Sequence, residues 1–129
     1  MSTRTREFAQ AASYFERALR ILKANPSAHP LYLAVTSGCQ GEFYGAQGMW
    51  AEAAASFETA LRLKQKTLGN SHPALVDTLA SYSQALSKIR RKKEAKQYEE
   101  QAREIAVGYT EAASLKSATV DVRALRAER

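Results

Sequence analysis

Residues 53–61 read Ala53-Ala54-Ala55-Ser56-Phe57-Glu58-Thr59-Ala60-Leu61, and this stretch decides the fold because it recurs along the chain. A related segment begins at Ala11 and another at Ala95, so the first alanine returns every 42 residues. The later alanine follows the same interval, at positions 18, 60 and 102. A regular interval of this length indicates an array of stacked structural repeats.

The repeated segment has the pattern of a packed helical face. Alanine, aromatic and alanine follow one another at i, i+4 and i+7, which places the three side chains on one side of a helix. The aromatic is Phe15 and then Phe57, whereas the third copy has Glu99 there with Tyr98 beside it. Small residues let a neighbouring helix approach closely, and the ring fills the space between them. The pattern therefore predicts core packing and implies no chemistry.

A second helix is predicted in each unit after the dipeptides His29-Pro30 and His72-Pro73. Proline suits the first turn of a helix, where its missing N–H would be unpaired anyway. Ser71 or His72 can occupy the cap position, and Gly69-Asn70 supplies a stop signal for the preceding helix. We expect helices at 31–47 and 74–90, so the unit is a helix, a short turn and a helix.

At this point the sequence resembles the tetratricopeptide repeat family, and specifically the long 42-residue units of the kinesin light chain kind. The residues that carry the resemblance are Gly41, Tyr44, Gly48, Trp50, Ala53, Phe57 and Ala60, together with the turn at 68–73. The resemblance covers residues 7–107 and implies an all-α fold, a right-handed α-solenoid of antiparallel helix hairpins. It implies protein binding as a function, without naming a partner.

The resemblance divides the chain into about two and a half repeats. We expect a repeat array over 1–107, made of a half repeat at 1–28, a repeat at 29–70 and a repeat at 71–107. The last unit departs from the family pattern at Ser83, Arg90 and Lys92, which indicates a degenerate terminal repeat. The cargo specificity of kinesin light chains is not carried over, because their asparagine-rich inner helices are missing. An incomplete array leaves an apolar edge exposed, which predicts a homo-oligomer or a longer parent protein.

The segment 108–129 lies outside the repeats and is expected to be a C-terminal extension or cap. Residues 111–116 are compatible with a short helical extension. Residues 119–125 alternate apolar and polar side chains, which favours an extended conformation, with a helical cap as the alternative.

The predicted inner helix at 31–47 carries glycines at positions 38, 41, 45 and 48, within an arc of about 80°. Glycine costs about 1 kcal/mol relative to alanine in a helix interior, so such an arc needs a reason. Gly41 has a packing role in the family pattern and Gly48 is expected in a turn. Gly38 and Gly45 fall on positions expected to face the concave surface. Our hypothesis is a bare strip that lets a partner backbone or helix come close; the alternative is a frayed or kinked helix without a ligand.

The same positional comparison extends the expected partner-binding surface to the next repeat. It assigns Asp77, Gln84 and Lys88 to the concave face, and Glu42 of the preceding repeat is expected on the same face. This mixture of charges suits a peptide with several polar contacts and fits nucleic acid poorly. The alternative is that these are ordinary surface residues.

The chain has an ordinary globular composition, with 45% hydrophobic and 25% charged residues in 129. No stretch approaches the length of a membrane span, and no apolar segment typical of a secretory signal follows the first arginines. Cys39 is the single cysteine, which fits a reducing environment, and we expect a buried thiol. These features predict a cytoplasmic protein.

No pattern of catalytic or cofactor-binding residues emerges. The glycines at 38–48 lack the preceding strand and the following Lys-Ser/Thr of a phosphate-binding loop. His29 and His72 lie in equivalent turns one repeat apart, too distant to share a metal. No pair of acidic residues suggests an acid–base couple. We expect a protein that is not an enzyme and has no cofactor or metal.

The net charge of +6 is partly local, since a basic cluster comprises Lys88, Arg90, Arg91, Lys92, Lys93 and Lys96. The leading interpretation is a module that binds a peptide or helix of a partner protein, with this cluster as a solvated turn. A second interpretation is a nucleic-acid-binding array that uses residues 88–96 with Tyr98. RNA-reading repeats carry reader side chains on every unit, however, and here the basic residues gather at one turn. A third interpretation is a structural or oligomerisation segment.

Overall fold

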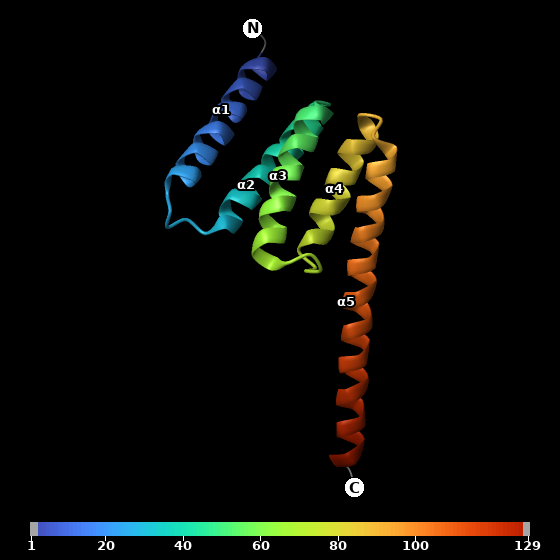
Figure 1. Cartoon of the computed structure of the whole chain (residues 1–129). Coiled ribbons are helices and arrows are strands. Elements are labelled where there is room, and N and C mark those ends of the chain that lie inside the picture. Colours follow the sequence, from blue (N-terminus) through green and yellow to red (C-terminus); the bar gives the residue numbers. More distant parts are fainter. Residues whose placement is uncertain (1–2, 128–129) are drawn as a thin grey trace.

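The computed structural model describes the backbone of residues 3–127 and the side chains of residues 3–116. This part of the chain forms five α-helices and no strand: α1 (Thr3–Ala24), α2 (Pro30–Ala46), α3 (Trp50–Leu68), α4 (Leu75–Lys88) and α5 (Lys92–Ala127). Figure 1 shows them side by side in chain order, each antiparallel to the next. The predicted all-α stack of helix hairpins is therefore confirmed.

The helix boundaries follow the turn residues of the sequence. Pro30 is the first residue of α2, and the His29 side chain caps that helix by accepting a hydrogen bond from the Leu31 amide, at 3.2 Å. In the next unit the His72 imidazole accepts from the Ala74 amide, at 3.0 Å. Gly69 has a φ of 89° and ends α3, as predicted for that glycine. The His29 imidazole thus satisfies an amide that the start of α2 leaves open, whereas His72 makes the same contact just before α4, whose cap residue is Ala74.

The prediction of an extended conformation at 119–125 is wrong. The last helix continues without a break through Ala127, and it projects beyond the other four (Figure 1). Extending an existing helix adds one hydrogen bond for each residue that is fixed, whereas a lone extended segment has no strand to pair with. The helical extension expected at 111–116 is present, and the side chains of residues 106–116 are all exposed.

The seam between α2 and α3 is the most closely packed part of the first full hairpin. Ala34, Ala53 and Ala60 are completely buried there. Gly41 faces the Phe57 ring so closely that a Cβ atom added to it would lie 2.7 Å from the ring carbons. The interpretation of the repeated pattern as core packing is confirmed for the copy at 53–61, because the Phe57 ring occupies the space left by the missing side chain of Gly41.

The second hairpin, α4 with α5, uses larger aliphatic residues and polar links. Leu75, Leu79 and Leu86 are completely buried along α4. The buried Ser83 hydroxyl donates to the Ala95 carbonyl at 2.7 Å and ties the two helices together. Ser83 stands 42 residues after Gly41, and Glu99 stands 42 after Phe57. The change from glycine to serine is therefore accompanied by loss of the ring that excluded a side chain.

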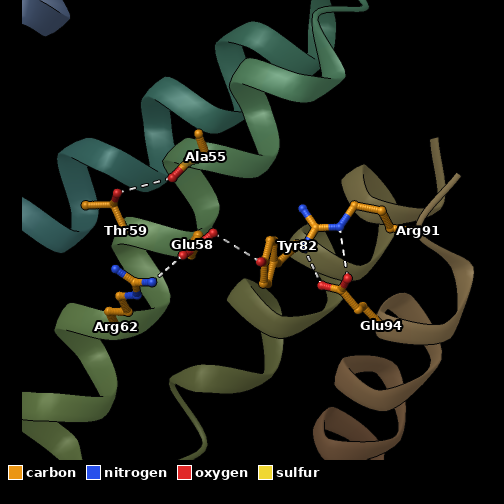
Figure 2. A network of polar contacts seen from close by, with 7 residues as sticks. All are labelled: Ala55, Glu58, Thr59, Arg62, Tyr82, Arg91 and Glu94. Carbon is orange, nitrogen blue, oxygen red and sulfur yellow. Dashed lines mark hydrogen bonds and ion pairs between the residues drawn. The ribbon is translucent and has the colours of Figure 1, made fainter. Parts of the chain in front are cut away.

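A buried tyrosine connects three helices. The Tyr82 hydroxyl donates to the Glu58 carboxylate of α3 at 3.3 Å, and its ring centroid lies 4.8 Å from that of Tyr98 on α5. Figure 2 shows Glu58 between Tyr82 and Arg62, whose guanidinium is 2.6 Å from the same carboxylate. Burial, and next the charge of Glu58, raise the pKa of Tyr82 to about 12, because both disfavour a phenolate.

The first helix is held less firmly than the others. No residue of α1 is buried. Its Phe8 ring stacks on Phe43 of α2 with centroids 4.9 Å apart, and Phe15 lies 5.5 Å from the same ring. A cluster of three aromatic rings therefore joins α1 to α2.

We expect Gly41→Ala to lower the free energy of unfolding by about 1–2 kcal/mol, since overpacking against Phe57 outweighs the gain in helix propensity. In a Phe57→Leu background the same substitution should be neutral or stabilising, because the smaller side chain leaves room. Urea denaturation of the single and double variants measures this coupling.

Gly38→Ala is the matched control for this cycle. A Cβ atom at Gly38 would meet only the Ala60 Cβ, at 4.0 Å, which is an ordinary contact. It should stabilise the protein by about 0.5–1 kcal/mol through propensity alone. Equal effects of the two glycine substitutions would contradict the proposed steric role of Gly41.

We expect Tyr82 to make the fold sensitive to alkali between pH 10 and 12. Below that range the Tyr82 phenol is protonated in the folded and the unfolded protein. Within it the phenol ionises first in the unfolded chain, so the free energy of unfolding falls as pH rises. Tyr82→Phe should flatten the decline in urea midpoint over this range, and Tyr109→Phe, at an exposed site, should not. An identical decline in all three proteins would rule out a late-titrating Tyr82.

Candidate functional site

The glycines of α2 point toward α3 and not toward an open surface. A Cβ atom at Gly45 would lie 3.1 Å from the Trp50 ring, and Gly38 faces Ala60. Both glycines are half-buried. The expectation that Gly45 belongs to a bare strip on the concave surface is therefore wrong, because Trp50 packs on it. α2 is helical without a break from Pro30 to Ala46, so the helix is not frayed at its glycines.

The outward face of α2 carries side chains that the sequence analysis did not select. Tyr32 is 65% exposed and Val35 is 57% exposed, and both are apolar or largely so. Cys39 is also exposed, so the expectation of a buried thiol is wrong. Glu42 lies on the same face and is exposed. Residues 32, 35, 39 and 42 lie on one side of the helix. The apolar members of this set, at 32, 35 and 39, could have been found from their periodicity in the sequence.

The corresponding face of α4 is polar. Asp77, Gln84 and Lys88 are all exposed, and they stand 42 residues after Val35, Glu42 and Ala46. Because equivalent positions of stacked repeats point to the same side, the α2 and α4 faces adjoin. We call the two together the α2–α4 face: Tyr32, Val35, Cys39 and Glu42 with Asp77, Gln84 and Lys88.

Trp50 joins the two repeats at one end of this face. The Lys88 ammonium lies 5.7 Å from the centroid of the Trp50 ring, within the range of a cation–π contact. The same ring also lies close to Gly45 of α2. The predicted site residues Gly45 and Lys88 are thus brought together, but through a ring that fills the space between them.

An open groove of about 460 Å³ lies between α4 and α5. Its lining includes Ser83, Ser87, Lys92 and Glu99, which stand 42 residues after Gly41, Gly45, Trp50 and Phe57. The two rings that fill the α2–α3 seam are therefore both replaced in the second hairpin. Three lysines, Lys88, Lys92 and Lys96, border this groove. Gln84 and Lys88 belong to both the groove and the α2–α4 face.

The middle of the basic cluster, Arg90–Lys93, covers the turn after α4 and the first residues of α5, and all four residues are exposed. Arg91 pairs with Glu94 of the first turn of α5 (Figure 2), and this hydrogen bond is the main cause that raises the pKa of Arg91. Arg90 has a φ of 67°, in the left-handed region. The equivalent residue of the preceding repeat is Gly48, with a φ of 75°. Arg90 thus adopts the left-handed backbone conformation that Gly48 adopts in the repeat at 29–70.

Residues 31–106 match the sequence profile of the tetratricopeptide repeat, and this span covers α2, α3, α4 and the first part of α5. The chain belongs to the tetratricopeptide repeat family. The predicted family is thereby confirmed. A comparison with curated proteins gave no match.

Tetratricopeptide repeats commonly serve as surfaces that bind other proteins, which supports a protein partner for this chain. Among the described residues, no three His, Cys, Asp or Glu side chains gather in a way that could hold a metal ion. None of the helices found in the described part of the chain is long and apolar enough to span a membrane.

We expect Arg90→Gly to raise the free energy of unfolding by about 1 kcal/mol, because glycine adopts the left-handed conformation without a steric cost. Thermal or urea denaturation measures the change. The mirror substitution Gly48→Ala should lower stability by a similar amount, since no atom lies within 4 Å of the added Cβ and only the backbone conformation is at issue. Two changes of the same sign would contradict this account of the turn.

Proposed function

We propose that this tetratricopeptide repeat protein binds a peptide or helix of a partner protein across the α2–α4 face. The observation that carries the proposal is the exposure of Tyr32 and Val35, at 65% and 57%, on a helix whose opposite side is buried in the core. Exposed apolar side chains grouped with polar ones are typical of protein interaction surfaces.

The polar half of the surface supports a peptide ligand. Glu42 and Asp77 carry negative charge, Lys88 carries positive charge, and Gln84 offers both donors and acceptors. Such a mixture fixes the orientation of a peptide backbone through several hydrogen bonds, while Tyr32 and Val35 bury its apolar side chains. Gly38 and Gly45 contribute by holding α3 close behind α2, and not as contact residues.

We further propose that the units are of the long, kinesin-light-chain-like kind. The 42-residue interval and the Leu-Gly-Asn-Ser-His-Pro turn at 68–73 support it. The division into 1–28, 29–70 and 71–107, with an extension at 108–129, is part of the same proposal, as are the absence of enzymatic activity and a cytoplasmic location.

Val35→Arg should reduce capture of the partner at least tenfold, which corresponds to about 1.4 kcal/mol of binding free energy. The measurement is affinity capture from native lysate with quantitative mass spectrometry, with circular dichroism to verify folding. Val107→Arg is the matched control, because Val107 is 51% exposed on α5, away from the α2–α4 face.

Equal loss of capture in both variants, or none in either, would contradict the proposal. Capture of nucleic acid with a steep dependence on salt would instead support the basic cluster 88–96 as the binding element. Recovery of the chain alone would support a structural or oligomerisation segment.

A further inference from the structure

The first and last helices carry the same four side chains on one side, but these side chains are buried to different extents in the two helices. Adding 84 to Ala11, Tyr14, Ala18 and Ile21 gives Ala95, Tyr98, Ala102 and Ile105, so the four residues are identical. We call the first set the α1 arc and the second the α5 arc. Identical side chains at equivalent repeat positions present the same shape and the same apolar area.

The α5 arc is packed against α4. Ala95 is 5% exposed and Ala102 is 7% exposed, and the Tyr98 ring lies against Tyr82 of α4. The α1 arc is covered only in part: Ala11 and Ala18 are half-buried, and α2 is the one helix that contacts α1 in the described chain. Tyr14 is 67% exposed and Ile21 is 62% exposed. Figure 1 shows α1 at the edge of the row, with its outer side open.

The opposite end of the stack has a different character. Ala54 and Leu61 of α3 are buried in the core cluster that α3 shares with α4, and 42 residues later α5 carries Lys96 and Arg103. Both are exposed, and Arg103 pairs with Glu99 at 3.2 Å. A polar outer face is how a repeat array ends in water. The apolar α1 arc lacks this feature, so the two ends of the stack are not equivalent.

We propose that the α1 arc is a second docking surface, which takes an amphipathic helix with the apolar face of α4. That face consists of Leu75, Leu79, Tyr82 and Leu86, at the spacing i, i+4, i+7 and i+11. A partner helix with leucines and an aromatic residue at this spacing covers Tyr14 and Ile21 as α4 covers Tyr98 and Ile105. This surface is on a different helix from the α2–α4 face, so the two proposals stand separately.

The probe is a fluorescein-labelled peptide of residues 74–90, which carries the α4 face, and binding is measured by fluorescence anisotropy with the intact protein. We expect saturable binding that Tyr14→Glu combined with Ile21→Glu weakens at least tenfold. The matched control is Tyr109→Glu combined with Val107→Glu, at side chains 62% and 51% exposed, and it should bind as the wild type does. Leu79→Glu and Tyr82→Glu in the peptide should abolish binding.

Several outcomes would overturn the proposal. One is failure of the wild-type protein to bind the peptide. Another is equal affinity in the α1 double variant, which would mean that the peptide displaces α4 from α5. Sedimentation of the wild type as a dimer that the α1 double variant converts to a monomer would assign the arc to a second copy of this chain. Circular dichroism of both double variants keeps loss of binding distinct from loss of folding.

Discussion

The close approach of α2 and α3 is the constraint on which the rest of the structure depends. It needs a residue without a side chain at Gly41 and a ring at Phe57 directly opposite, flanked by fully buried alanines. An aromatic side chain gives a large buried area, but only where the facing backbone leaves room for it. This arrangement sets the rotation of α2 about its axis, and therefore which of its residues remain in contact with water. The exposed positions of Tyr32 and Val35 are a consequence of how the opposite side is packed.

The second hairpin keeps the same register with different chemistry. The steric pair of glycine and phenylalanine is replaced by serine and glutamate, and a hydroxyl–carbonyl hydrogen bond joins the helices instead. Leucines of α4 and the Tyr82–Tyr98 ring contact then provide the burial that two rings provide in the first hairpin. One backbone geometry is thus stabilised in two ways. The second hairpin, with its polar link, leaves an open groove beside α5, whereas aromatic rings fill the equivalent space in the first hairpin.

The helices could be predicted from sequence because their signals are local and repeated. The 42-residue interval, the His-Pro pairs and Gly69 each act through backbone geometry that does not depend on distant contacts. The orientation of the glycines could not be predicted in this way. A glycine gives no hydrophobic signal, so periodicity places it on an arc without saying which neighbour occupies that arc. A buried Cys39 was expected because free cysteine is among the most often buried residues, but its position on the same helical side as Tyr32 and Val35 leaves it exposed. The alternation of apolar and polar side chains at 119–125 gave a wrong prediction, because such a pattern indicates a strand only where another strand is available for pairing.

The contact of Trp50 with both repeats has an optical consequence. Trp50 is the only tryptophan in the chain, and its indole lies between Gly45 of α2 and the ammonium of Lys88. A nearby cation and a close-packed helix both affect the emission of an indole. The tryptophan emission of this protein therefore comes from one position, at the junction of two repeats and at the end of the α2–α4 face. Changes in the relative position of the hairpins are thus observable in the unlabelled molecule.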